Sequence, residues 1–290
     1  MSEYLLQILL SGLTEGCIYA LMGLGLVIIH RSTEVLFFGQ GVLAMAGGIT
    51  MYALYGQNHL PLAISIALAF IVCTAVALVA QWSVILPLLS RGVSPFNVSI
   101  ITIGIAMIYE MVAMIMFGKD PLPVPSFSGD RPIGILGVSI VPQHIWIVAS
   151  TALILLVILC FFKKTWLGKA LTGLGDNRIL ALALGFPVAR LFTYSFVLAA
   201  IVGGLAGIVS APISYTGYWV GTRLTIKGFV AAAVGGINNP LGAVLGGLMV
   251  GLFEVLASGF ISSNLKDLIA MVLLLLVLKI RPEGLLGARE

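Results

Sequence analysis

Three carboxyl side chains lie inside long apolar stretches of the sequence, where an ionised group is costly to bury. Glu15 lies in SGLTEGCIYA, Glu110 in ITIGIAMIYE and Glu254 in GLMVGLFEVL. A carboxyl in such a place either hydrogen-bonds to a neighbouring helix, where burial favours its protonated form, or lines a polar pathway through a membrane. Both interpretations stay open for each of the three acids. We expect no matching basic side chains inside the apolar stretches, which argues against a proton relay.

Two further polar points interrupt the apolar pattern. Gln40 and Gly41 open the second apolar stretch, and Gln40 would be a polar side chain at membrane depth. Asn238 and Asn239 lie between two apolar runs in GGINNPLGAVLGG. Broken helices with exposed backbone polar groups are tolerated where they line a water-filled path. For the second point an ordinary turn, with the Asn-Pro pair starting the next helix, is the favoured alternative.

Sequence motifs for nucleotide hydrolysis and for the common hydrolytic sites are absent. A phosphate-binding loop requires GxxxxGK[ST], but Asp120 and Ala170 follow the two Gly-Lys pairs of this sequence. The patterns HExxH, GxSxG and CxxC do not occur either. The three histidines stand far apart at the ends of apolar stretches. We therefore expect no catalytic, cofactor-binding or metal site in this chain.

The composition is that of an integral membrane protein. The 290 residues are 60% hydrophobic and only 9% charged, whereas soluble domains average roughly 25% charged residues. The mean hydropathy is +1.15. The formal net charge of +4 is small and lies mostly in loops, which favours a topological role and excludes a nucleic-acid partner. We expect an all-α polytopic protein in the lipid bilayer, with residues 1–290 forming a single transmembrane domain.

The 34 glycines support close helix packing. Glycines four residues apart stack on one helix face and admit another backbone. Such pairs occur at Gly12/Gly16, Gly203/Gly207, Gly242/Gly246 and Gly247/Gly251.

A transmembrane helix needs about 20 mostly apolar residues. This criterion predicts eight spans, at residues 4–29, 35–55, 61–82, 96–118, 143–162, 191–212, 240–259 and 264–280. A shorter apolar segment, 224–237, is interrupted by Lys227 and is either a re-entrant element or a short crossing. The expected fold therefore has eight to nine transmembrane helices with interrupted or re-entrant segments.

The charge distribution orients these helices. The loop 163–190 carries five of the fifteen Lys and Arg residues, so we expect it on the cytoplasmic side. Counting back places Arg31 and Arg91 inside and the loop 119–142 outside. The tail with Lys279, Arg281 and Arg289 lies inside only if 224–237 also crosses, which favours nine crossings.

The extracellular loop 119–142 is rich in proline. Its alternating stretch ILGVSIV predicts a short strand or hairpin arm. The loop is either a structured cap without ligand contact or a docking surface for a soluble partner.

Four stretches carry a family resemblance and keep their order along the chain. They are GLTEGCIYALMGLGLVIIHRSTEVLFFGQGVLAMAGG, LGDNRILALALGFPVARLFTYSFVLAAIVGGLAG, IKGFVAAAVGGINNPLGAVLGGLMVGLFE and RPEGLLG. The chain resembles the LivH-type permeases of the branched-chain amino-acid ABC transporter family. It departs from the family pattern at Phe37, where Asn is usual, and at Val42, where Glu or Ala is common. The resemblance does not specify the substrate, since relatives include permeases that resemble urea and short-amide transporters.

The resemblance implies a permease subunit of an ABC importer rather than an enzyme. It would form half of the pathway for branched-chain amino acids or related small polar or amide solutes. The implied partners are a related second permease subunit in a heterodimer, two cytoplasmic ATPases that hold ATP and magnesium, and an extracytoplasmic solute-binding protein. The implied location is the bacterial inner membrane, crossed several times.

The same resemblance turns the loop 163–190 into a candidate ATPase-coupling segment. The family's loop pattern Ala-x-x-Leu-Gly is filled by Ala181, Leu184 and Gly185. We expect LTGLGD to turn the chain, with Asp176 as a helix cap and Asn177 beside it. The following NRILALALG would form a short amphipathic helix that docks in a groove of the ATPase. The alternative is a passive positively charged loop.

Two other classes of protein compete with the importer. An ATP-independent channel or facilitator for a small neutral solute such as urea would explain the broken helices but leave the basic loop without a role. A membrane-embedded enzyme would need carboxylates, His or Lys clustered near one interface, and the sequence offers no such cluster.

Overall fold

The computed structural model describes residues 2–129, 131–135, 138–176, 178–260, 262 and 266–287. Its first half contains α1 (Ser2–Thr33), α2 (Gln40–Met51), the π-helical turn η1 (Tyr52–Gln57), α3 (Leu62–Ala80), η2 (Gln81–Ile85), α4 (Leu86–Ser90), α5 (Pro95–Phe117) and the strands β1 (Ile133–Ile135) and β2 (Val138–Ile140). Its second half contains α6 (Pro142–Lys164), α7 (Trp166–Asp176), α8 (Arg178–Ala183), α9 (Val188–Ser214), α10 (Val220–Gly235), α11 (Pro240–Phe260) and α12 (Lys266–Ile280).

The all-helical membrane fold expected from composition agrees with the structure. Six helices of the described chain are long and apolar enough to cross a membrane, namely α1, the continuous stretch Leu62–Ser90, α5, α6, α9 and α11. The other predicted spans also fall on helices: 35–55 on α2 with η1, 224–237 on α10 and 264–280 on α12. These three are shorter, so the number of crossings is not settled by helix length and composition.

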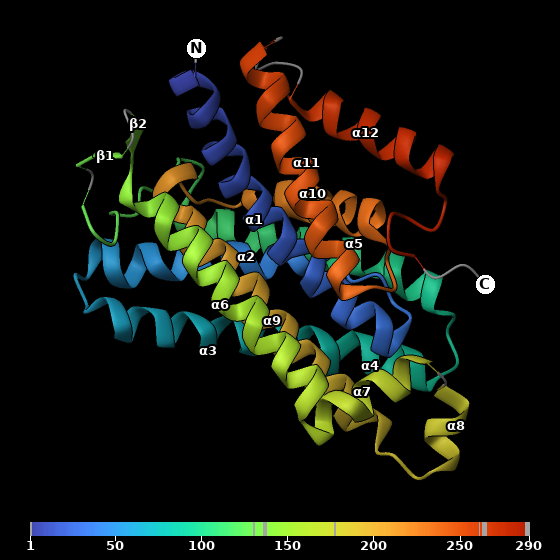
Figure 1. The fold of residues 1–290 in the computed structure, drawn as a ribbon. Helices are drawn as coiled ribbons and strands as arrows, with labels where there is room; N and C mark the ends of the chain where they lie inside the picture. Colours follow the sequence, from blue (N-terminus) through green and yellow to red (C-terminus); the bar gives the residue numbers. More distant parts are fainter. Residues whose placement is uncertain are drawn as a thin grey trace.

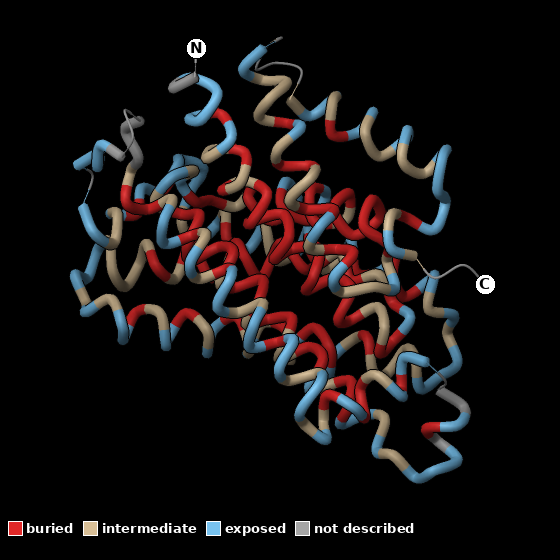
Figure 2. The backbone as a smooth tube through the Cα atoms, in the orientation of Figure 1, coloured by how far each residue is buried: buried red, intermediate tan, exposed pale blue. Residues whose placement is uncertain are grey.

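The buried core is formed by helices that are far apart in the sequence. Figure 2 shows buried backbone concentrated in the centre of the bundle, where α1, α2, α9 and α10 pack together, and exposed backbone along α3, α5 and α6. Leu21, Met22 and Leu26 of α1 are completely buried. The outer helices expose Leu, Ile, Val and Met side chains, as lipid-facing helices do.

Closely packed glycines join α1 to α11. Gly16 of α1 lies against Gly247 and Leu248, and Gly251 lies against the backbone of Gly16. A Cβ atom added at Gly251 would overlap the Gly16 backbone. The tight helix packing expected from the four-residue glycine spacing is confirmed at this interface.

Substituting Gly251 is expected to disrupt this interface. Gly251→Leu should lower the unfolding free energy by about 3 kcal/mol, because two backbones would have to separate to admit the side chain. Gly104→Leu on α5 is the matched control, since nothing lies within 4 Å of a Cβ atom there. Thermal melting of the two variants in detergent tests this. Equal melting temperatures for the two variants would contradict it.

The loop 119–142 contains a small antiparallel hairpin. Strands β1 and β2 pair with Ile133 opposite Ile140, as the alternating sequence predicted. Leu122 forms an isolated antiparallel bridge with Thr216, the second residue beyond the end of α9. The loop is tied to the helical bundle there and again near Phe127 and Ser128, where the Phe127 N–H donates to Gln143 Oε1 at 3.3 Å and Trp146 Nε1 donates to Ser128 Oγ at 2.8 Å.

Candidate functional site

A cluster of charged side chains lies among four helices. Glu254 of α11 is 1% exposed, and its carboxylate accepts hydrogen bonds from Lys227 Nζ of α10 at 3.0 Å and from Tyr19 Oη of α1 at 3.1 Å. The Lys227 side chain is 7% exposed. A nearly buried ion pair of this kind is retained only when both charges are well compensated.

The cluster extends through the start of α12. Lys227 Nζ lies 2.6 Å from Asp267 Oδ1, and Lys266 Nζ lies 3.4 Å from Glu254 Oε1 and 3.6 Å from Glu15 Oε1. The side chains of Glu15 and Lys266 are about one-third exposed, and that of Asp267 is 84% exposed. The charges thus run from the protein interior to its surface.

The expectation that the intramembrane acids lack basic partners is wrong. Lys227 and Lys266 both contact Glu254. Their positive charges compensate the negative charge of its carboxylate. Lys227 was visible in the sequence only as an interruption of an apolar segment. The short turn between α10 and α11 could have predicted this ion pair. Two helices joined by a short turn pack side by side, so a lone lysine on one can contact an acid on the next.

A polar cavity of about 290 Å³ lies beside the cluster. It is bounded by α1, α6, α9 and α11, and both Glu15 and Lys266 line it. Its other polar side chains are Ser11, Thr14, His144, Ser210, Ser214 and Ser258. Paired acidic and basic groups with several hydroxyls are the chemistry that binds a small solute carrying both charges.

Glu110 lies apart from this cluster, at the contact between α5 and α10. Its carboxylate accepts hydrogen bonds from the Thr222 hydroxyl at 2.7 Å and from the Thr222 backbone N–H. The neighbouring Met107 and Met111 of α5 are more than half exposed. Glu110 therefore fixes the first turn of α10 to a helix with exposed apolar side chains on its outer face.

The chain between α1 and α2 is not helical, and side-chain hydroxyls satisfy its backbone. The Leu36 N–H donates to Ser99 Oγ at 2.9 Å and the Phe38 N–H donates to Thr102 Oγ1 at 3.0 Å, both on α5. The Thr225 hydroxyl of α10 accepts from the Gly41 N–H at 3.0 Å and donates to Phe38 O at 3.1 Å. The residues 34–39 form the α1–α2 joint, which is the interrupted segment that the sequence predicted.

Gln40 opens α2 and is completely buried. Its Nε2 donates to Ala199 O of α9 at 3.0 Å. Gly25 of α1 and Gly203 of α9 both press against this amide. A solute could reach Gln40 only if these helices moved apart.

The hydroxyls at the α1–α2 joint give a direct test of its role. Thr102→Val should lower the unfolding free energy by about 1 kcal/mol, because it leaves the partly buried Phe38 N–H without its partner. Thr50→Val is the control, since the Thr50 hydroxyl bonds only within its own helix, to Ala46 O at 2.7 Å. Denaturant melts in detergent measure both, and a Thr102 variant as stable as the Thr50 variant would refute the assignment.

The segment 236–239 is a turn, as favoured from the sequence. Asn239 caps α11, with its Oδ1 accepting from the Leu241 N–H at 3.0 Å and the Gly242 N–H at 3.3 Å. Asn238 lines a separate cavity of about 410 Å³ together with His30. Both asparagines lie at the end of the bundle that also holds the start of α11.

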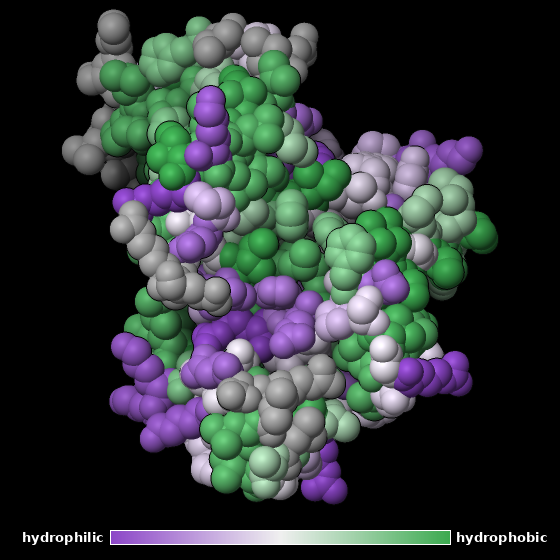
Figure 3. All heavy atoms as spheres, turned by 90° about the vertical axis from the view of Figure 1, so that its right-hand side faces the viewer, coloured by the Kyte–Doolittle hydropathy of each residue, from purple (hydrophilic) through white to green (hydrophobic). Residues whose placement is uncertain are grey.

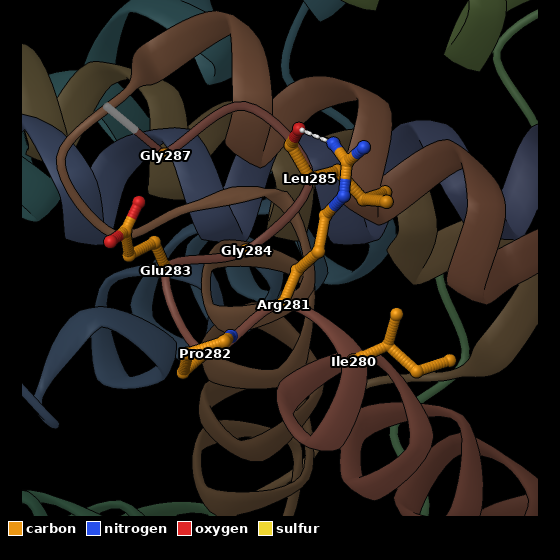
Figure 4. Close-up of a pocket in the computed structure, with 7 residues that line it drawn as sticks. All are labelled: Ile280, Arg281, Pro282, Glu283, Gly284, Leu285 and Gly287. Carbon is orange, nitrogen blue, oxygen red and sulfur yellow. Dashed lines mark hydrogen bonds between the residues drawn. The ribbon is translucent and has the colours of Figure 1, made fainter. Parts of the chain in front are cut away.

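The C-terminal segment Arg281–Gly287 closes the end of α10. The N–H groups of Leu285 and Leu286 donate to Val234 O at 2.9 Å and Gly235 O at 3.0 Å, which are terminal helix carbonyls. Arg281 Nη1 donates to Leu285 O at 3.3 Å and holds the loop closed (Figure 4). The predicted basic tail therefore lies against the α10–α11 turn, apart from Arg289, which is outside the described residues.

The loop 163–190 contains the short helix expected in NRILALALG, as α8, and a second helix, α7, that covers the segment where a turn was expected. Residues 171–176 form the second half of α7 rather than a turn, so Asp176 is the last residue of a helix and not the cap of the next one. Leu171 and Leu174 are buried, and this packing outweighs the low helix propensity of the intervening glycines. Asn177 lies outside the described residues.

The helix α7 rests on the end of α1. Asp176 Oδ1 lies 3.0 Å from Arg31 Nη2, and Gly175 lies against Arg31 O. A side chain at Gly175 would push the two helices apart. The loop 163–190, the candidate coupling segment, therefore contacts α1 two residues before that helix ends, next to the α1–α2 joint.

The segment beyond α7 exposes apolar side chains. Ala181 of α8 is 5% exposed, whereas Leu180 is 55% exposed and Leu184, just after the helix, is 67% exposed. Trp166 at the start of α7 is 66% exposed, and its ring lies 5.9 Å from that of Phe186. Gly185 has a φ of +77°, which glycine adopts without strain and which ends the helix.

Comparison with known sequences identifies the family. Residues 8–278 match the family described as the permease component of the branched-chain amino acid transport system. The chain belongs to this family.

Two curated relatives match the permease almost from end to end. The high-affinity branched-chain amino acid transport system permease protein LivH of Salmonella typhimurium is 28% identical and covers 100% of this chain and 99% of its own. The corresponding protein BraD of Pseudomonas aeruginosa is 28% identical, with 98% and 96% covered. The family resemblance drawn from the sequence is thereby confirmed.

A solved structure shares the fold of the permease. PsaBC from Streptococcus pneumoniae in complex with Fab superposes with a TM-score of 0.51 at 17% identity, over 97% of this chain and 92% of the other. At this identity the likeness supports the fold alone.

The structure brings together some of the predicted site residues of the permease and separates others. Glu15 and Glu254 share the charged cluster, and Ala181, Leu184, Gly185 and Asp176 share the coupling segment. Glu110 and the pair Gln40 and Gly41 lie in a second place, where Gly221 of α10 packs against both Glu110 and Gly41. The pair Asn238 and Asn239 lies in a third place.

Proposed function

We propose that this permease forms half of the translocation pathway of an ABC importer for amino acids, either branched-chain ones or related small polar or amide solutes. The observation that carries the proposal is the end-to-end match to permeases named for branched-chain amino acids. The polar cavity with Glu15 and Lys266 supports it, because an amino acid carries one charge of each sign.

The proposed partners divide the work. A related second permease subunit completes the pathway, two cytoplasmic ATPases bind ATP with magnesium, and an extracytoplasmic binding protein delivers the solute. The chain lacks a phosphate-binding loop, so the driving motion has to come from other subunits. The loop 119–142, tied to the bundle at Leu122 and Thr216, is the proposed landing surface for the binding protein.

We place the second permease subunit on the outer face of α5. This helix is among the least buried of the long helices, and its exposed side chains include Met107 and Met111. Unlike α3 and α6, it carries a membrane-depth carboxylate, Glu110, beside the exposed start of α10. A pathway between two subunits would expose such a group to the passing solute.

The coupling segment transmits motion by two routes. The ATPase binds the exposed apolar side chains around Leu184 and pulls on α8. One route runs through Phe186 and Pro187 into α9, which packs on α1, α2 and α3. The other runs through the contact of Asp176 with Arg31 to the α1–α2 joint.

The remaining pathway residues act when the helices move. In the state described here Glu15 lines the cavity, and the buried Glu254 lies behind it in the charged cluster. Gln40 and Gly41 lie at the α1–α2 joint, and Asn238 and Asn239 lie at the turn between α10 and α11. Both places are breaks between helices, where a rearrangement would uncover backbone and amide groups.

We propose nine crossings with the loop 163–190 and the C-terminal segment in the cytoplasm of a bacterial inner membrane. Adding α2 with η1, α10 and α12 to the six long helices gives this number and one transmembrane domain over residues 1–290. Figure 3 supports the proposed cytoplasmic position of the C-terminal segment. Hydrophilic side chains gather between apolar areas on the side of the protein that carries α8, α12 and this segment.

Reconstitution tests this function. The permease should co-purify with a second permease and two ATPases, and proteoliposomes should take up labelled leucine, isoleucine or valine only with ATP and the binding protein. If the proteoliposomes take up no amino acid and no small amide, the proposed substrate class is refuted. Flux of urea without ATP would favour the facilitator instead.

A further inference from the structure

A groove of about 290 Å³ runs between α1, α6, α7 and α11 on the outside of the bundle. Most of its wall is hydrocarbon: Leu155, Ile158, Leu159, Phe162, Leu241 and Val244. The neighbouring residues of α6 face away from the protein, with Leu153 65% and Leu156 61% exposed. An occupant of this groove therefore reaches it from the hydrocarbon of the bilayer rather than from water.

The groove is polar at one end only. Arg31 and Lys163 are the charged groups among its described lining residues, and Thr172 and Asn239 lie beside them. The nearest acid is Asp176, which binds Arg31 Nη2 at 3.0 Å. A guanidinium carries five N–H groups, so this ion pair does not exhaust the donors of Arg31.

We propose that this groove binds an anionic phospholipid. Its acyl chain lies along the apolar wall, and its phosphate lies between Arg31 and Lys163, which supply the donors because the Thr172 hydroxyl donates to Gly168 O at 3.0 Å. The polar end faces the coupling segment, so the lipid comes from the cytoplasmic leaflet if the proposed orientation holds. Juxtamembrane Arg and Lys residues attract the anionic headgroups of that leaflet.

The bound lipid has a structural consequence for the permease. Arg31 belongs to α1 and Lys163 to α6, so one phosphate would tie these two helices together. Arg31 also holds α7 against α1 through its ion pair with Asp176. An anionic lipid bound here therefore stabilises the contact between α1 and α7, on which the coupling segment rests.

Melting of the purified permease with added lipid tests the proposal. Phosphatidylglycerol should raise the melting temperature by about 3 °C more than phosphatidylcholine with the same acyl chains. Lys163→Gln should remove at least half of this difference. Lys164→Gln is the matched control, because the next lysine is also exposed but does not line the groove, and it should keep the full difference.

A second variant and a second ligand complete the test. Val244→Phe should lower the stabilisation by lipid with the charges left in place, because it fills the groove. Equal shifts with the two lipids, equal behaviour of the two lysine variants, or full stabilisation by inorganic phosphate alone would overturn the proposal. These melting measurements need neither the ATPase nor a solute. They therefore test lipid binding even if the proposed transport function is wrong.

Discussion

Leu184→Glu is expected to abolish ATP-driven uptake while leaving the permease folded. Leu184 is 67% exposed and lies with Leu180 and Trp166 among the exposed apolar side chains of the coupling segment. An apolar anchor at the centre of an interface contributes about 2 kcal/mol or more, and burying a charge there without a partner costs a similar amount again. We therefore expect the affinity for the ATPase to fall by about 1000-fold.

The measurement is co-purification of the ATPase together with uptake by the assembled importer. Ser90→Glu is the control, because it adds the same charge to an exposed position at the end of α4, on the side of the membrane proposed for the coupling segment. It should leave both readouts unchanged. Wild-type uptake by the Leu184 variant would show that α8 does not receive the ATPase.

The helices could be predicted from the sequence because membrane spans depend on local composition. The break at residues 34–39 was also predictable, since Gln40 and two flanking glycines interrupt an apolar run. The hydroxyls that stabilise it were not predictable. Ser99 and Thr102 lie about 60 residues further along the chain, and only the packing of α5 against the α1–α2 joint brings them there.

The course of α7 and the partners of the buried acids were mispredicted for the same kind of reason. Gly173 and Gly175 suggest a turn locally, but the contact with the end of α1 requires a residue without a side chain at Gly175. Lys227 and Glu254 are separated by 27 residues, and each looks isolated in its own apolar segment. Contacts between helices determine both the course of α7 and the ion pairs of Glu254, and such contacts are not visible in a local stretch of sequence.

Lys227→Met is expected to be among the most destabilising single substitutions in the charged cluster. It leaves Glu254, 1% exposed, without its 3.0 Å partner. Removing one member of a buried ion pair costs about 3–5 kcal/mol, and we expect the lower end because Tyr19 and Lys266 still contact the carboxylate. Lys266→Met should cost less than about 1 kcal/mol, because its side chain is one-third exposed and its distances are longer.

The double variant Lys227→Met/Glu254→Met separates a structural role from a transport role. Replacing both members of a buried pair by apolar side chains is often nearly neutral for stability, so this variant should regain most of the lost unfolding free energy. If the cluster is part of the pathway, uptake by the assembled importer stays low although the permease is stable. A double variant that is both stable and active would mean that the pair only packs helices, and Glu15 would then have to bind the solute without it.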